Sequence, residues 1–244
     1  MRPVLFVGTC GFSKSRAEIF GKLQAVEIQE SFYRHVDLAT AKRWRRDSPK
    51  DFIFSVKASQ LITHDPSSPT YRKSDFVPDP GSATKYGSFR PTREVVAAWR
   101  KTEETCRILD AKAVLFQTPP PFRPSEETID NIGKFMQRAE TKMIRAWEPR
   151  GDWPREYIEE ICSRHRLVHC VDPFAEETVT TKTAYFRLHG KPPGGRSFYY
   201  TYSDQELATL RETCAGFDEV HVFFNNISMF ADAVRFRRLA DVQG

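Results

Sequence analysis

Two stretches decide the fold: Ala184-Tyr-Phe-Arg-Leu-His-Gly190 and Glu219-Val-His-Val-Phe-Phe-Asn-Asn226. Each is a run of apolar, β-branched and aromatic residues, which is the composition of a buried parallel strand. Both runs stop on polar side chains that can bind or react. In parallel α/β folds the C-terminal strand ends form the ligand-binding face. The two stretches therefore predict neighbouring strands with a binding or catalytic site at their tips.

Six further runs of the same kind precede these two, at 4–7, 25–28, 52–57, 113–117, 143–148 and 167–172. Helical patterns separate them, and several begin at capping residues, such as Thr92, Ser125, Asp152 and the Ser203–Glu206 capping box. Eight strands alternating with helices in 244 residues match a (β/α)8 barrel. We predict an α/β fold, a single TIM-like barrel domain over residues 1–244.

Two long loops are predicted after strands 3 and 7, at about 64–91 and 190–202. The alternative fold is a doubly wound open sheet, which usually carries a glycine-rich phosphate turn after its first strand. Gly8-Thr-Cys-Gly11 stands at that place and lacks the full G-x-G-x-x-G pattern. The barrel is therefore favoured.

Charge and cysteine content narrow the class of protein. The net charge of +5 is compatible with a phosphate-bearing or nucleic-acid partner, and equally with an ordinary basic surface. Five cysteines without a Cys-x-x-Cys pair argue against a disulfide framework or a zinc knuckle, and predict reduced thiols in a cytoplasmic protein. No apolar stretch approaches the ~18 residues of a membrane span, so no membrane partner is expected.

Several ordered motifs resemble one known family. They are Val7-Gly-Thr-Cys-Gly-Phe12, Val26-Glu-Ile-Gln-Glu-Ser-Phe-Tyr33, Phe52-Ile-Phe-Ser-Val-Lys57 with Ile62-Thr-His64, Tyr185-Phe-Arg-Leu-His-Gly190, Tyr202-Ser-Asp-Gln-Glu-Leu207 and Val222-Phe-Phe-Asn-Asn226. The chain is similar along nearly its whole length to the YecE-like family, catalogued as domain of unknown function 72. The resemblance implies a TIM barrel and brings no established reaction with it.

Six strand-tip residues are the candidate catalytic groups: Glu27, Lys57, His64, Glu148, Asp172 and His189. Glu27 lies inside an apolar strand, where a carboxylate needs a partner, so a structural ion pair and a catalytic role are equally favoured. Lys57 can pair with Glu27, hold an anion, or form a Schiff base. His64 is either an acid/base group or an anchor for the loop after strand 3.

Six others are candidate substrate-binding residues: Tyr33, Gln117, Trp147, Arg150, Arg187 and Asn225. Arg150 and Arg187 suit an anion, Gln117 and Asn225 a polar substrate, and Trp147 stacking. For Trp147, ordinary packing is the more common role. The loop after strand 7 adds Lys191, Arg196 and a flexible Gly194-Gly195 pair, which predict a lid.

These residue types fit two schemes. In one, Glu148, Asp172 and His189 ligate a divalent metal, Mg or Mn, that activates water while Lys57 and Arg187 hold a phosphate. In the other, no metal is present, and His64 or His189 moves protons for a sugar-like or phosphorylated substrate. The favoured prediction is a phosphoester hydrolase, with DNA or RNA as the favoured substrate. An isomerase or aldolase acting on a phosphorylated sugar and a non-catalytic nucleic-acid-binding barrel are the alternatives.

Overall fold

The protein is described by a computed structural model that covers residues 3–190 and 197–241. Its eight parallel strands form a closed barrel in the order β1 to β8, which confirms the predicted (β/α)8 fold. The strands are β1 (Val4–Cys10), β2 (Ala25–Ile28), β3 (Ile53–Lys57), β4 (Ala113–Gln117), β5 (Ile144–Glu148), β6 (Val168–Val171), β7 (Thr183–Leu188) and β8 (Glu219–Phe224).

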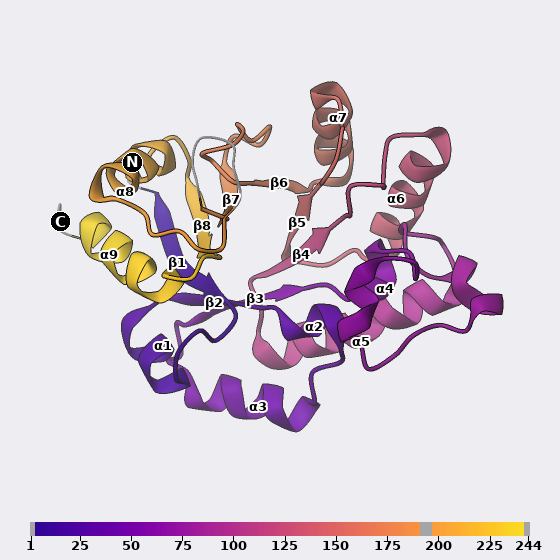
Figure 1. Cartoon of the computed structure of the whole chain (residues 1–244), viewed down its shortest axis with the longest axis horizontal. Helices are drawn as coiled ribbons and strands as arrows, with labels where there is room; N and C mark the ends of the chain where they lie inside the picture. The colour runs from indigo at the N-terminus through magenta and orange to yellow at the C-terminus, as the bar shows by residue number, and fades with distance from the viewer. Residues whose placement is uncertain (1–2, 191–196, 242–244) are drawn as a thin grey trace. The chain divides into compact units, whose positions relative to one another are not determined.

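Helices alternate with these strands (Figure 1). They are α1 (Arg16–Lys22), α2 (Glu30–Tyr33), α3 (Leu38–Asp47), α4 (Gln60–Thr63), α5 (Arg93–Leu109), α6 (Glu126–Arg138), α7 (Arg155–His165), α8 (Asp204–Cys214) and α9 (Met229–Asp241), with two 3-10 helices, η1 (Pro69–Lys73) and η2 (Pro80–Lys85). Both 3-10 helices lie in the long loop predicted after strand 3.

The chain divides into two compact units. Unit 1 comprises Met1–Ile28, Ser48–Ile53 and Val168–Gly244, and unit 2 comprises Gln29–Asp47 and Phe54–Leu167. The expectation of a single domain over the whole chain stays a prediction.

Local sequence signals explain most helix starts. The hydroxyl of Thr92 accepts the Val95 N–H at the start of α5. Ser203 and Glu206 form the predicted capping box of α8. The predicted start at Asp152 is wrong, because α7 begins at Arg155 after Pro154, which supplies no side-chain cap. Pro154 is the N-cap residue of α7, and its side chain has no oxygen that could accept an N–H of the first turn.

In unit 1, β1 pairs in parallel with both β2 and β8, and β7 pairs with β8. Helices α8 and α9 pack on each other, and α9 also packs on β1 and β8 (Figure 1). Gly8 permits the close approach of β1 and β2, since a Cβ there would lie 2.3 Å from the carbonyl oxygen of Ala25. These contacts bring the C-terminal ends of β1, β2, β7 and β8 together.

Among the helices within residues 3–190 and 197–241, none is both long enough and apolar enough to cross a membrane.

Candidate active site

A fully buried ion pair occupies the interior of unit 1. Arg187 on β7 contacts the Glu27 carboxylate on β2 through Nε at 3.2 Å and Nη2 at 3.0 Å, both to Oε1. The Tyr185 hydroxyl donates to the other oxygen, Oε2, at 2.5 Å. Glu27 has no exposed surface and Arg187 is 1% exposed. The structural ion pair is therefore the role that the contacts of Glu27 support, and its partner is Arg187.

Cys10 on β1 completes this group. Its Sγ lies 3.5 Å from Glu27 Oε1 and 3.6 Å from Arg187 Nη2. Burial, and then the negative charge of Glu27, raise the pKa of the Cys10 thiol far above its usual value. The thiol is therefore protonated and donates to the carboxylate. A protonated, buried thiol is a packing and hydrogen-bonding group and a poor nucleophile.

Asp172 and His189 lie together at the C-terminal ends of β6 and β7. The backbone N–H of His189 donates to Asp172 Oδ2 at 2.8 Å, and His189 Nδ1 lies 3.6 Å from the same oxygen. The other carboxylate oxygen accepts the N–H of Phe174 at 3.1 Å. Both side chains are more than nine-tenths buried. The carboxylate is thus fixed by the backbone and faces the imidazole ring.

The turn after His189 depends on Gly190 and Tyr202. Gly190 has a φ of +80°, and a Cβ there would lie 2.4 Å from the carbonyl oxygen of Ser197. Its N–H donates to the Tyr202 hydroxyl at 2.7 Å, while the Tyr202 ring stacks on Phe174. Burial, and then the nearby Asp172 charge, raise the Tyr202 pKa, so the hydroxyl stays protonated. Tyr202 therefore supports the segments that carry His189 and Asp172.

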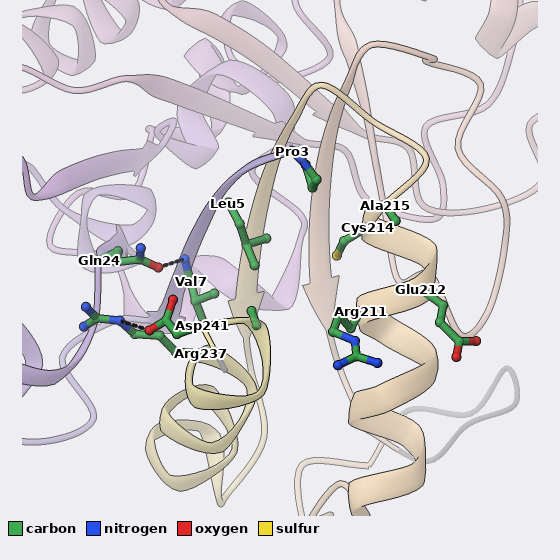
Figure 2. Close-up of a pocket in the computed structure, with 11 residues that line it drawn as sticks. Pro3, Leu5, Val7, Gln24, Arg211, Glu212, Cys214, Ala215, Arg237 and Asp241 are labelled. Carbon is green, nitrogen blue, oxygen red and sulfur yellow. Dashed lines mark hydrogen bonds and ion pairs between the residues drawn. The ribbon is translucent and has the colours of Figure 1, made fainter. Parts of the chain in front are cut away.

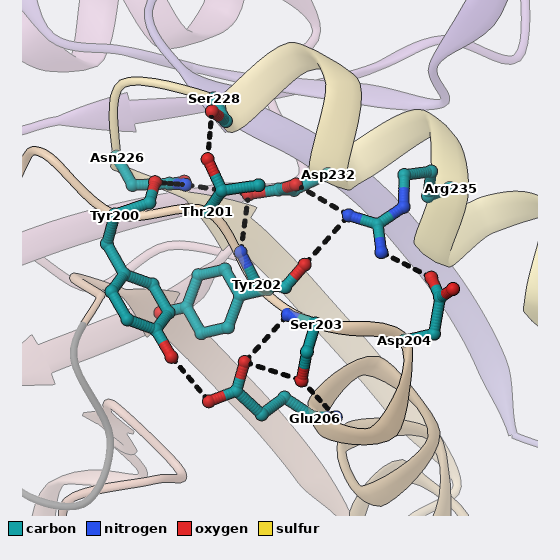
Figure 3. Close-up of polar contacts among 10 residues, drawn as sticks. All are labelled: Tyr200, Thr201, Tyr202, Ser203, Asp204, Glu206, Asn226, Ser228, Asp232 and Arg235. Atoms are coloured by element: carbon teal, nitrogen blue, oxygen red, sulfur yellow. Dashed lines mark hydrogen bonds and ion pairs between the residues drawn. The ribbon is translucent and has the colours of Figure 1, made fainter.

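A second set of buried contacts fixes Tyr202 itself (Figure 3). Asp232 on α9 has no exposed surface and accepts the Tyr202 N–H at 3.2 Å and the Asn226 amide at 2.7 Å. Arg235 donates to Asp232 Oδ1 at 3.0 Å and to the Tyr202 carbonyl at 2.8 Å, and also contacts Asp204. Helices α8 and α9 thereby hold the end of the loop that follows β7.

In unit 2, Lys57 and His64 flank one aromatic ring. Lys57 Nζ lies 3.9 Å from the ring centroid of Phe32, and the His64 ring packs edge-on against the same residue with centroids 4.9 Å apart. The short helix α2 holds Phe32 in place, since the Ser31 hydroxyl donates to the Lys57 carbonyl at 2.7 Å. The Thr63 hydroxyl contacts His64 Nδ1 at 2.8 Å. The sequence-predicted residues Lys57 and His64 are thus neighbours.

Glu148 and Arg150 lie near His64 as well. Arg150 Nε and Nη2 both contact Glu148 Oε1, at 2.7 and 2.6 Å. Gln117 pairs with Glu148 in the β4–β5 register. Lys57, Arg150 and Glu148 all lie close enough to His64 to influence its ionisation. Unit 2 therefore gathers two cations, one carboxylate and one imidazole, all of them predicted from the sequence.

The His64 imidazole is neutral in this environment. Burial, followed by the positive charges of Lys57 and Arg150, lowers the His64 pKa to about 3. A neutral ring with so low a proton affinity donates or accepts hydrogen bonds but does not exchange protons near neutral pH. The anchoring role of His64 is therefore the one that its surroundings support. Its carbonyl oxygen accepts the Tyr71 hydroxyl at 3.0 Å within the loop after β3.

The low pKa of His64 predicts a stability change with pH. Because the unfolded chain protonates this ring near pH 6.5 and the folded chain only near pH 3, stability falls as the pH drops through that window. The loss between pH 7 and pH 5 is about 2 kcal/mol for this group. Denaturant unfolding at both pH values measures it, and His64→Asn should show a smaller loss. Equal losses in wild type and variant would contradict the assignment.

Other predicted binding residues have different surroundings. Trp147 is fully buried and packs edge-to-face on Trp153, with centroids 5.1 Å apart, so packing, the more common role, is the one observed. Arg187 forms an ion pair with Glu27. Asn226, buried against Asp232, is the structural member of the asparagine pair, while Asn225 is half-buried and its N–H donates to the Leu188 carbonyl. Substrate contacts by Tyr33, Gln117 and Asn225 stay predictions.

The predicted metal ligands are occupied by protein donors. Asp172 accepts two backbone N–H groups and Glu148 accepts two N–H groups of Arg150. Over the part of the chain that the structure describes, no three His, Cys, Asp or Glu side chains are grouped to hold a metal ion. The residues present therefore do not fit the predicted set of Glu148, Asp172 and His189.

The predicted lid residues in the loop after β7, Lys191, Gly194, Gly195 and Arg196, lie outside the described residues.

Two residues of the buried hydrogen-bond networks, Tyr185 and Asp232, are not singled out by the sequence patterns. A signal exists for Asp232, because it follows Met229 by three residues on the buried face of α9 and is a charged residue among apolar ones.

Comparisons with known proteins agree on the family. Residues 16–243 match the model described as "Protein of unknown function DUF72". A DUF72 family protein from Enterococcus faecalis V583 is similar in structure, with 19% identity, a TM-score of 0.74 and 97% of each chain covered. One from Thermotoga maritima MSB8 shows 23% identity and a TM-score of 0.69, covering 97% of this chain and 98% of that one.

Endonuclease IV from Thermus thermophilus shares the fold with 13% identity, a TM-score of 0.52 and full coverage of both chains. No curated protein matches the sequence. The family model spans nearly the whole chain, and the two DUF72 structures have the same barrel along their length. The resemblance inferred from the motifs is confirmed: this protein belongs to the DUF72 family.

Proposed function

We propose that this protein hydrolyses phosphoester bonds in a nucleic acid, with His189 as the general base. The observation that carries the proposal is the Asp172–His189 pair, in which a carboxylate fixed by the backbone faces Nδ1 of the ring at 3.6 Å. A carboxylate on one ring nitrogen orients the imidazole and favours proton uptake at the other. Distances in such pairs often shorten when substrate binds.

The cations of unit 2 are assigned to the phosphate backbone of the substrate. Lys57, Arg150 and Glu148 together carry one net positive charge, and His64 is neutral. A lysine ammonium and an arginine guanidinium are the usual protein ligands of phosphate oxygens. A nucleic-acid strand carries a phosphate at every nucleotide, so it offers phosphate oxygens that Lys57 and Arg150 can bind.

In the proposed step, His189 takes a proton from water as the water oxygen forms a bond to phosphorus. The bond from phosphorus to the leaving oxygen breaks, and solvent protonates that oxygen. The products are one phosphate end and one hydroxyl end. Asp172 stabilises the imidazolium that forms and keeps the ring in position.

The substrate class has separate support. The fold is shared with a protein named endonuclease IV, and the net charge of +5 suits a polyanion. The decisive experiment incubates purified protein with labelled single- and double-stranded DNA and RNA, with Mg, Mn or EDTA. We expect cleavage of at least one substrate. Absence of cleavage throughout, or cleavage that survives Asp172→Ala combined with His189→Ala, would sink the proposal.

The aldolase alternative is less well supported. A Schiff base needs Lys57 as the neutral amine, whereas the contact of Nζ with the face of Phe32 at 3.9 Å favours the ammonium form. Borohydride trapping with carbonyl compounds should therefore leave Lys57 unmodified. The non-catalytic alternative differs in another way, because it predicts salt-dependent binding without turnover in any condition.

Lys57→Gln tests the phosphate assignment. Removing one phosphate contact should weaken binding of a single-stranded oligonucleotide about tenfold at low salt and reduce the slope of log affinity against log salt by about 0.7. Titration by fluorescence anisotropy at several salt concentrations measures both. Lys14→Gln, at an exposed position on the same chain, is the matched control and should leave the slope unchanged. An unchanged slope in Lys57→Gln would remove this residue from the phosphate site.

A further inference from the structure

A cavity of about 420 Å³ lies in unit 1 between α8, α9 and the outer face of β1 (Figure 2). Its lining includes Leu5 and Val7 near the start of β1, Arg211 and Cys214 near the end of α8, and Arg237 and Ala240 near the end of α9. His189 lies at the opposite, C-terminal end of its strand. The cavity is therefore separate from the proposed active site, and a ligand bound in it is independent of the proposed function.

The floor of the cavity is apolar. Leu5 and Val7 project from β1 toward the two helices, and Cys214 faces them from the end of α8 (Figure 2). Ala215 and Ala240 also line the cavity. The helix residues are small at the place where leucine or phenylalanine would fill the space. An unfilled apolar cavity forfeits packing contacts, and an apolar ligand body would restore them. The volume falls within the range of ~300–1,000 Å³ that small-molecule sites occupy.

At the rim of the cavity, one cation has no ion-pair partner in the described part of the chain. Arg237 donates to the Lys22 carbonyl at 2.9 Å and faces Asp241 at 3.6 Å. Arg211 has neither a hydrogen bond from its guanidinium nor an ion pair with any residue in 3–190 or 197–241. Glu212 projects from the side of α8 away from α9 (Figure 2). Glu212, Arg237 and Asp241 also line the cavity, and Arg211 is the lining cation that pairs with no carboxylate within residues 3–190 and 197–241.

We propose that this cavity binds a small amphipathic carboxylate, with its apolar body on Leu5 and Val7 and its carboxylate on Arg211. A guanidinium presents two parallel N–H donors that match a carboxylate. The apolar floor excludes inorganic phosphate and nucleotides, which need polar partners around most of their surface. An aliphatic or aromatic acid of moderate size satisfies both halves of the site.

Three matched probes test the assignment: octanoate, octanol and octylamine, titrated into the purified full-length protein by calorimetry or NMR. Octanoate should bind about tenfold more tightly than octanol, as one partly exposed charge-assisted contact implies, and octylamine should bind most weakly. Arg211→Gln should reduce octanoate affinity about tenfold and leave octanol unchanged. Arg16→Gln, an exposed arginine on α1, should alter neither.

Ala240→Trp fills the cavity and should abolish binding of both octanoate and octanol, with the fold checked by circular dichroism. Arg211→Gln changes a partly exposed side chain, so its result stands even if the tryptophan variant fails to fold. The proposal is overturned if octanoate shows no binding up to millimolar concentration. It is equally overturned if octanoate and octanol bind alike to wild type, or if Arg211→Gln leaves octanoate affinity intact.

Discussion

Replacing Arg187 by methionine is expected to lower the free energy of unfolding by roughly 3–5 kcal/mol. The substitution removes the cation that faces the Glu27 carboxylate and leaves a charge with no exposed surface inside unit 1. Methionine has a similar length and fills most of the space, so the loss reports the charge. Tyr185 and Cys10 still donate to Glu27, so we expect a loss of unfolding free energy toward the lower end of this range. Urea unfolding measures it.

Two further variants separate the charge from the packing. Glu27→Gln in the Arg187→Met background removes the buried negative charge and should recover part of the loss. Arg155→Met breaks the exposed pair with Glu159 and should cost less than about 1 kcal/mol. If Arg187→Met is no more destabilising than Arg155→Met, the buried pair is not what holds the interior of unit 1 together.

His189→Gln is expected to lower kcat for phosphoester hydrolysis roughly 10²–10⁴-fold, since it removes the proposed general base. Asp172→Asn should lower kcat through the same step, because Asp172 orients the ring and stabilises its protonated form. Steady-state kinetics on the best substrate of the panel measures both effects.

The pattern of losses distinguishes a catalytic pair from two structural residues. Residues that act as a unit give non-additive effects, so the double variant should be no slower than His189→Gln alone. His165→Gln, a half-buried histidine on α7, is the control and should retain activity. Multiplicative losses, or equal losses in the control, would point to a general effect on the fold and away from a base.

Much of the fold is predictable from local sequence. Each strand is a short apolar run, and the Ser203–Glu206 box marks a helix start that needs no tertiary information. The strand tips are also predictable, because the C-terminal end of a strand in this fold carries function. This reasoning identifies Lys57, Glu148, Asp172 and His189, and each lies beside at least one other of the predicted residues.

The partners of these residues are not predictable, because they depend on contacts between distant parts of the chain. Tyr185 and Glu27 are separated by 158 residues, yet their side chains share a hydrogen bond. The role of Trp147 is also not predictable from the strand pattern. Its ring packs on Trp153, which lies in the segment after β5. Periodicity gives the face on which a side chain lies, and tertiary packing decides what it meets.

The left-handed turn at Gly190 illustrates a third kind of limit. A glycine after a strand predicts a turn, but its φ of +80° and the Tyr202 hydroxyl that accepts its N–H follow only from the packed loop. Those two features position His189. The sequence therefore locates the residues at this strand end, while the loop and helices α8 and α9 determine their geometry.

The most direct test of the account is mass spectrometry of reaction products formed in water labelled with heavy oxygen. Wild-type protein and the nucleic acid of the panel that it cleaves best should yield fragments in which one phosphate end carries a single heavy oxygen atom. His189→Gln should form these fragments roughly a hundredfold more slowly or worse. Fragments that lack the heavy oxygen, or no fragments at all, would contradict hydrolysis by water that His189 activates.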